Sequence, residues 1–175
     1  MAADSAAMYA KSALVTVVLT ACAQPTVRVA PPAPAQPSWC IHEMVDQDKH
    51  PAFVTLDRRY RSADRRAAFR FLVHIDITTG EQNADGLPTD HEAAILNQVE
   101  DGITTRLFAA EPVAFVGRAT TSGHRELFYY AANAAQANAV LASRPPDLRA
   151  WEFQVADEAD WHTVMPLLDD DSPCL

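Results

Sequence analysis

The chain has 175 residues and a mass of 19.1 kDa, which is enough for one domain of ordinary size together with a targeting segment. Hydrophobic residues make up 49% of it and charged residues 21%, proportions that exclude a wholly disordered chain, a collagen-like repeat and a polytopic membrane protein. The formal net charge of −9 argues against broad electrostatic binding to nucleic acid or to anionic lipid.

The first segment predicts export. Lys11 precedes an apolar run over residues 12–21, whose ten residues at about 1.5 Å each span only about half of a bilayer's hydrocarbon core. That length is typical of the hydrophobic region of a secretory signal peptide. Leu19-Thr20-Ala21-Cys22 resembles a bacterial lipobox, in which the cysteine receives diacylglycerol and the peptidase cuts before it. We expect a signal peptide over 1–21 and a lipid on Cys22; the alternative is a short buried helix or strand that ends in cysteine.

The residues on either side of the apolar run 12–21 complete the N-terminal region. Translation begins at Met1 or at Met8, and the later start gives the short basic segment that signal peptides usually have. Residues 22–38 contain five prolines and no aromatic residue, so they favour extended conformations and build no core. We interpret this segment as a tether that holds a folded domain away from the membrane.

Beyond the tether, apolar stretches alternate with polar turns. Residues 39–44 and 52–56 predict two strands that are joined by a polar loop over 46–51. Six arginines follow within 58–70. Residues 71–77 then predict a strand with one buried and one more polar face.

The clearest helix is expected to begin at Thr89. Thr89-Asp90-His91-Glu92 fits a capping box, in which the threonine accepts an amide hydrogen bond and Glu92 reaches back to the threonine amide. Apolar residues at four-residue spacing continue the helix on one face: Ile95, Val99, Ile103 and Leu107.

The C-terminal half predicts a hairpin, a helix and a last strand. In chain order these are a strand over 113–121, a strand over 125–131, a helix over 133–143 that Asn133 caps, and a strand over 150–155. Asp157 is expected to cap a short helix that contains Trp161.

From Phe71 onward the elements follow the order β-α-β-β-α-β, which is typical of the split βαβ arrangement of ferredoxin-like folds. We therefore predict an α+β ferredoxin-like sandwich over 39–168, with both helices on one face of the sheet and an additional N-terminal β-hairpin. Residues 169–175 are expected to form an acidic tail.

Several stretches carry a resemblance to a known family. They are His74-Ile75-Asp76, Leu87-Pro88 at the helix start, Glu100-Asp101 within the helix, and the Gly117 to Tyr130 hairpin with its Gly-x-x-x-x-x-Gly-x-Arg pattern. Over 39–168 the sequence resembles the bacterial domain-of-unknown-function 695 family and, more distantly, the regulator of ribonuclease E activity B family. The resemblance implies a ferredoxin-like fold and a non-catalytic domain, and it supplies no established substrate.

Motifs of common chemistry give little support for an enzyme. The sequence contains no Gly-x-Ser-x-Gly elbow, and with five glycines it cannot form a Gly-rich phosphate loop. His74 and Asp76 share one strand face and would hold a metal if His124 or His162 approached them; the alternative is hydrogen bonding at the sheet surface. We expect no cofactor and no resident metal.

The arginines of residues 58–70 are the best argument for nucleic acid, because Tyr60, Phe69 and Phe71 are interleaved with them. The overall acidity and the export signal oppose that interpretation. We expect these arginines to pair instead with some of the chain's own 23 carboxylates.

A binding patch is nevertheless expected on the sheet. Arg118 and Arg125 either clamp a ligand or pair with Glu100 or Asp101, and one of the two adjacent tyrosines fills the core while the other faces outward. The candidate residues are His74, Asp76, Arg118, Arg125, Tyr129 and Tyr130.

Whether the cysteines pair depends on the compartment. Acylation of Cys22 would leave Cys40 and Cys174, which tend to pair in an oxidising periplasm. The alternative is two unpaired thiols, with Cys174 loose in a frayed tail.

These features favour a lipid-anchored, non-enzymatic envelope protein that faces the periplasm and binds a protein or small ligand through its sheet. Its expected partners are the membrane, through the lipid on Cys22, and a protein; nucleic acid is not expected. The alternative is an RNA- or ribonuclease-associated regulator, and a third possibility is a metal-assisted hydrolase that uses His74 and Asp76.

Overall fold

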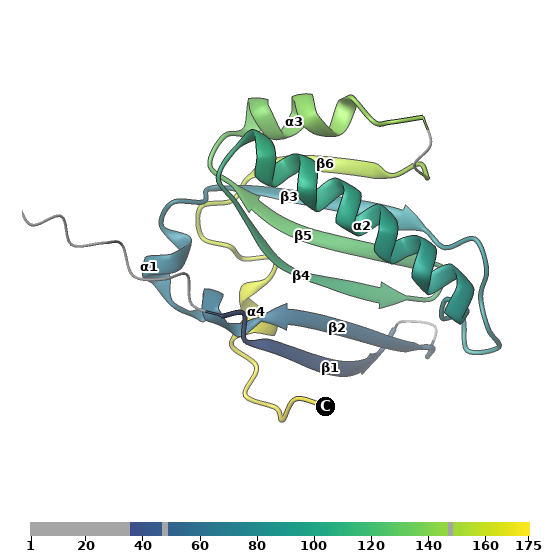
Figure 1. Ribbon diagram of the computed structural model, residues 1–175. Helices are drawn as coiled ribbons and strands as arrows, with labels where there is room; N and C mark the ends of the chain where they lie inside the picture. The colour runs from purple at the N-terminus through teal and green to yellow at the C-terminus, as the bar shows by residue number, and fades with distance from the viewer. Residues whose placement is uncertain (1–35, 47–48, 147–148) are drawn as a thin grey trace, which may run out of the picture. The chain divides into compact units, whose positions relative to one another are not determined.

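Six antiparallel strands form one sheet, and four α-helices pack beside it (Figure 1). The computed structural model describes residues 36–46, 49–146 and 149–175, and these counts refer to those residues. The strands are β1 (Trp39–Val45), β2 (Pro51–Asp57), β3 (Phe71–Thr78), β4 (Val113–Thr121), β5 (His124–Ala131) and β6 (Glu152–Asp157). The helices are α1 (Ala63–Arg66), α2 (Asp90–Ala110), α3 (Ala134–Ala142) and α4 (Met165–Leu168), with a 3₁₀ helix η1 (Arg58–Arg61).

The strand order in the sheet is β1-β2-β4-β5-β3-β6, and every neighbouring pair is antiparallel. The predicted N-terminal hairpin is confirmed as β1 and β2, and it joins the sheet through β4. Gly117 lies at this junction, where a Cβ atom would collide with the carbonyl oxygen of Thr55. The close approach of β2 and β4 therefore requires glycine there.

The helices α2 and α3 pack on one face of the sheet and enclose the larger core (Figure 1). Val99, Ile103 and Leu107 of α2 are buried there, as the four-residue spacing predicts. The same core holds Val73, Ile75 and Ile77 of β3, because alternate residues of a strand point to the same face.

Only one half of the predicted capping box forms. The hydroxyl of Thr89 accepts from the amide of Glu92 at 3.2 Å, but the Thr89 amide donates to the carbonyl of Glu81 at 3.1 Å. The Glu92 carboxylate is buried and turns instead to Arg149 and to the amide of Gly80, the latter at 2.8 Å. A buried carboxylate needs a charged partner, which the threonine amide would not supply.

The C-terminal helix differs from the prediction. Asp157 is the last residue of β6 rather than a helix cap, because it pairs with Phe71 across the strands and its carboxylate binds Arg70 at 2.6 Å. Trp161 precedes the helix with a φ of 60°, and the helix itself is Met165–Leu168. Trp161, Val164 and Leu168 pack on the second face of the sheet with residues of β2, β3, β4 and β5.

Residues 169–175 bind to the edge strand β1 rather than fray. The amide of Leu175 donates to the carbonyl of Ile41 at 3.0 Å, and Arg58 donates to the carbonyls of Asp170 and Ser172 at 2.8 and 3.0 Å.

Among the described residues, no helix is both long and apolar enough to cross a membrane.

Candidate functional site

The second face of the sheet is covered only in part. Trp161 and its neighbours cover the part that holds Leu72 and Tyr130. Farther along the same strands, polar side chains stay partly or wholly exposed. We call this region the open surface and define it by His74 and Asp76 of β3, His124 and Glu126 of β5, and Glu152 and Gln154 of β6.

Two histidine–carboxylate pairs cross from β3 to β5 within the open surface. Nε2 of His74 lies 2.9 Å from Oε1 of Glu126, and Nδ1 of His124 lies 3.0 Å from Oδ1 of Asp76. The register places Asp76 opposite Glu126, so each pair is diagonal across the two strands. Each of the two facing carboxylates therefore has an imidazole beside it, which offsets the repulsion between Asp76 and Glu126.

The environment of Glu126 favours its charged form. The hydrogen bond with His74 holds the pKa of Glu126 below its usual value, while burial acts in the opposite direction. The His74 ring also stacks on Phe128, with ring centroids 5.2 Å apart. His74 is therefore held by a carboxylate at its edge and by an aromatic ring on its face.

Two shallow cavities meet at His74. One has a volume of about 270 Å³ and is lined by Asp76, Glu152 and Gln154 as well as His74. The other has a volume of about 460 Å³ and extends past Glu126 toward the C-terminal segment. The open surface is therefore contoured and offers carboxylates, imidazoles and an amide as hydrogen-bonding groups.

A different cluster has the composition of a cation site. Ligand atoms of Glu158, Asp160 and His162 lie within 4.8 Å of one another, and they form the one such group among the described residues. The Glu158 carboxylate, however, already accepts from the Tyr130 hydroxyl at 2.8 Å and from the Thr163 amide at 2.6 Å. These contacts give Glu158 a structural role, holding the C-terminal segment against the sheet.

The remaining members of the predicted patch do not lie on the open surface. Arg118 and Arg125 lie on the opposite face, beneath α2, where Nη1 of Arg118 and Nη1 of Arg125 are 3.1 and 3.7 Å from Oε2 of Glu100. Tyr129 is buried on that face, and its hydroxyl lies 2.7 Å from the Thr104 hydroxyl. The six predicted residues are thus divided between two faces of the sheet.

The prediction that one of the two tyrosines faces outward is wrong. Tyr129 and Tyr130 do point to opposite faces, but both have 0% exposure. Tyr130 is covered by Trp161, which stacks on it. Burial raises the pKa of both phenols.

The arginines of residues 58–70 donate chiefly to the chain's own oxygens. Arg59 binds the buried Asp57, and Arg70 binds Asp157 with two hydrogen bonds of 2.7 and 2.6 Å. Arg66 donates to the carbonyls of Tyr60 and Arg61 at 2.7 and 2.6 Å. Their guanidinium groups therefore stabilise the turn region and the tail.

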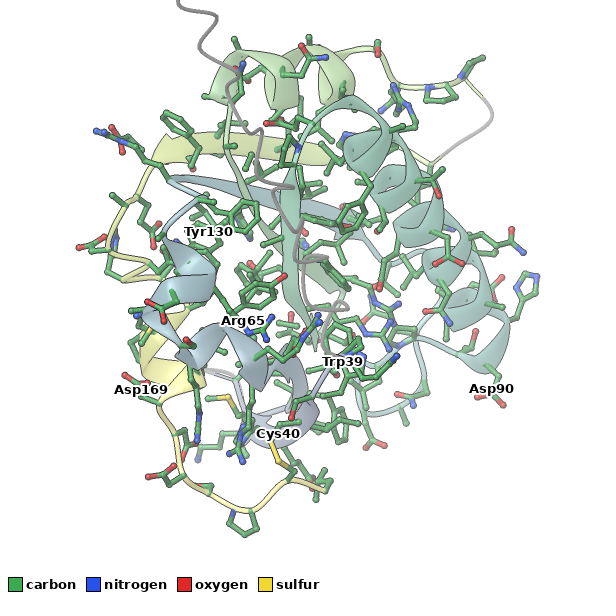
Figure 2. All side chains as sticks on the ribbon, turned by 60° about the vertical axis from the view of Figure 1, so that its left-hand side comes forward. Trp39, Cys40, Arg65, Asp90, Tyr130 and Asp169 are labelled. Atoms are coloured by element: carbon green, nitrogen blue, oxygen red, sulfur yellow. A yellow bond between two sulfur atoms is a disulfide. The ribbon has the colours of Figure 1, made fainter. Side chains whose placement is uncertain are left out.

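Cys40 and Cys174 are joined by a disulfide, with their Cα atoms 5.1 Å apart. Figure 2 shows this bond beside the Cys40 label, where it ties the C-terminal segment after Asp169 to β1. Nε2 of His42 lies 3.2 Å from the Cys40 sulfur, and Nδ1 of His42 lies 3.7 Å from a carboxylate oxygen of Asp170. Cys22, the predicted lipidation site, lies outside the described residues.

Sequence reasoning missed Glu126 and the structural role of Trp161. Glu126 lies two residues from His124 on the hairpin, so the i, i+2 rule places both on one strand face once the pairing of β3 with β5 is known. No local signal placed Trp161 on Tyr130, because 30 residues separate them in sequence.

The fold and the open surface define a small domain of mixed α and β structure, whose antiparallel sheet is covered by helices on one face and is partly exposed on the other. The chain belongs to the family of unknown function DUF695, whose family model matches residues 39–168. The resemblance seen in the sequence is thereby confirmed for that family. No curated protein and no solved structure matches the chain.

Proposed function

We propose that this protein is a lipid-anchored, non-enzymatic envelope protein that faces the periplasm and binds a partner protein through the open surface. The observation that carries the binding proposal is the exposure of two histidine–carboxylate pairs on a sheet face that the chain itself covers only in part.

The anchoring proposal draws its support from the order of segments in the sequence. The lipobox-like Leu19-Thr20-Ala21-Cys22 precedes a proline-rich stretch, and the family domain begins immediately after it at Trp39. A lipid on Cys22 with a semi-rigid spacer would hold the domain at the membrane surface.

The charge of the open surface indicates the chemistry of the partner. The open surface carries three carboxylates, those of Asp76, Glu126 and Glu152, but only two imidazoles, so it is negative when His74 and His124 are neutral. We infer that the partner presents lysine or arginine side chains, which would form charge-assisted hydrogen bonds with these carboxylates.

The finer fold assignment is part of the same proposal. We assign the domain from β3 to β6 to the ferredoxin-like class, since its elements follow the order β-α-β-β-α-β and the strands lie in the order β4-β5-β3-β6. An open sheet face opposite two helices is a surface on which a partner can pack.

The other two interpretations have less support. Five arginines of residues 58–70 donate to oxygens of the chain itself, which leaves the RNA-associated regulator without its main positive surface: Arg58, Arg59, Arg61, Arg66 and Arg70. The hydrolase would need His74 and Asp76 as metal ligands, but each is paired with a residue of β5.

Metabolic labelling with a palmitate analogue tests the anchor. We expect a labelled protein in the membrane fraction and an unlabelled one after Cys22→Ala. Unlabelled wild-type protein in the cytosol, with no change on Cys22→Ala, would contradict the anchor and favour the regulator instead.

Site-specific photocrosslinking in cells tests the binding surface. A photoreactive residue at Gln154, which is exposed on the open surface, should capture a discrete partner, whereas one at the exposed Asn138 of α3 should not. Asp76→Lys should abolish the Gln154 crosslink, and the matched change Asp101→Lys on α2 should leave it intact. A crosslink that survives Asp76→Lys would place the binding elsewhere.

A further inference from the structure

A groove lies on the face of the sheet opposite to the open surface, beside α2. Its volume is about 370 Å³, at the lower end of the range for small-molecule sites. The β1–β2 hairpin extends the sheet past α2, so the helix leaves this end of the face uncovered (Figure 1). Side chains from the hairpin, from β4 and from α2 line the groove: Trp39, Ile41, Thr55, Phe115, Arg118 and Glu100.

The walls of the groove are largely apolar and remain in contact with solvent. Trp39 is 47% exposed and Ile41 is 37% exposed, although both are large hydrophobic residues. The Trp39 ring, labelled in Figure 2, lies 5.8 Å from the Phe115 ring between their centroids. Neighbouring exposed apolar groups of this kind mark a surface that a ligand can cover.

Arg118 lines the groove, and a second guanidinium, that of Arg125, is buried beside it beneath α2. Arg118 and Arg125 share the single carboxylate of Glu100, at 3.1 and 3.7 Å. Arg125 is 5% exposed and also donates to the Asn97 side chain at 2.7 Å, so it stays beneath α2. Burial lowers the pKa of Arg125, and the nearby charge of Arg118 lowers it further, while the charge of Glu100 acts in the opposite direction.

Arg118 is the guanidinium that a ligand can reach. Its side chain is 34% exposed and lines the groove, and only its Nη1 donates to Glu100, at 3.1 and 3.3 Å. Among the described residues, none accepts a hydrogen bond from its Nε or Nη2. A guanidinium presents its donors as a planar fork that matches a carboxylate.

We propose that this groove binds an amphipathic monocarboxylate, with an unbranched alkyl chain against Trp39, Ile41 and Phe115 and the carboxylate on Arg118. The anion would balance the second guanidinium, and the chain would remove the exposed apolar walls from water. A cationic amphiphile would meet like charge on Arg118, and a neutral one would gain only the apolar contact. This site is separate from the open surface and stands or falls without it.

Binding of decanoate to the purified full-length protein tests the proposal. The controls are decanol, a neutral amphiphile used below its solubility limit, and decyltrimethylammonium, a cationic amphiphile used below its micelle concentration. Trp39 is the reporter, since Trp151 and Trp161 are only 8% and 0% exposed. Decanoate should shift the tryptophan emission to shorter wavelength and should bind at least about tenfold more tightly than either control, the ratio expected for one charge-assisted bond. Trp39→Phe should remove the emission shift while calorimetry still detects binding.

Paired variants locate the site. Arg118→Gln should remove the preference for decanoate over decanol, and Arg118→Lys should retain part of it. Ile41→Glu places a negative charge in the groove and should weaken decanoate binding about tenfold or more, whereas Met44→Glu on the opposite face of the same edge strand should not. Both positions are exposed, so neither change endangers folding.

Three results would overturn the proposal. The first is equal affinity for the three amphiphiles, which would indicate unspecific apolar contact. The second is equal weakening by Ile41→Glu and Met44→Glu, which would remove the groove as the site. The third is the absence of calorimetrically detectable decanoate binding below its micelle concentration.

Discussion

The phenol ring of Tyr130 stacks on the indole of Trp161, with ring centroids 3.7 Å apart and 7° between the ring planes. The Tyr130 hydroxyl donates to Glu158 at 2.8 Å, and the Trp161 indole nitrogen donates to the carbonyl of Phe69 at 2.8 Å. The C-terminal segment is therefore part of the second core of the domain. It closes one part of the sheet face and leaves the open surface beside it.

Removal of the Trp161 indole should strongly destabilise the fold. Trp161→Ala is expected to lower the free energy of unfolding by about 3–5 kcal/mol, because it leaves a cavity over Tyr130 and an unpaired carbonyl at Phe69. Urea denaturation measures the change. Trp39→Ala is the matched control, since Trp39 is 47% exposed and should cost much less. Equal losses in the two variants would contradict the packing role of Trp161.

The helix α2 should depend more on its buried face than on its cap. Ile103→Ala is expected to cost about 2–5 kcal/mol, because the side chain is 1% exposed under the helix. Thr89→Ala should cost about 1 kcal/mol, the usual value for a lost N-cap bond. Thermal melts followed by circular dichroism should rank Ile103→Ala below Thr89→Ala, with Asp90→Ala closest to the wild type. A reversed order would mean that the helix buries a different face.

The Cys40–Cys174 disulfide should stabilise the domain by closing a very long loop. The two cysteines are 134 residues apart, for which the chain-entropy model gives at most about 5 kcal/mol. Reduction and alkylation should lower the denaturation midpoint, and the Cys40→Ser, Cys174→Ser double variant should match the reduced protein. The background for both is Cys22→Ala, which removes the third cysteine. Two free thiols in unreduced protein of this background, expressed in the periplasm, would contradict the bond.

The stability that Glu126 contributes should vary with pH. Its pKa is lower in the folded protein, because of the bond with His74, than in the unfolded chain. The pairing therefore stabilises the fold above the unfolded glutamate pKa of about 4.3, and this contribution is lost as the pH falls through the lower folded pKa. Glu126→Gln should reduce the free energy of unfolding at neutral pH, and its difference from the wild type should shrink in acid. Glu152→Gln, on the same surface but outside both histidine–carboxylate pairs, should cost less free energy of unfolding at neutral pH.

Much of the secondary structure could be predicted from local patterns. The alternation in 71–77, the apolar spacing from Ile95 to Leu107 and the Asn133 cap each depend on residues a few positions apart. The predicted helix that Asp157 would cap does not form, because β6 pairs with β3 as far as Asp157. Strand pairing of this kind is a long-range contact. The Glu92 half of the capping box failed because Arg149, 57 residues away, provides a charged partner.

The candidate site illustrates the same division. His74 and Asp76 share a strand face in any fold that contains this strand, so sequence alone placed them together. Arg118 points to the other face of the sheet, where it pairs with Glu100 of α2. This placement depends on the register of β4 after its irregularity between Phe115 and Gly117. A shift of one residue in register reverses every later side chain, and no local pattern reports it.

The sequence by itself determined the order of the six strands and of the two longer helices, the acidic charge and the cysteines available for pairing. Only the tertiary structure decided which parts of the sheet stay uncovered. That outcome depends on where residues 158–168 pack and on how far the β1–β2 hairpin extends past α2. Local propensity acts over a few residues, whereas the exposure of a side chain depends on every contact that the chain makes with itself. The open surface and the groove could therefore not be predicted from local sequence patterns.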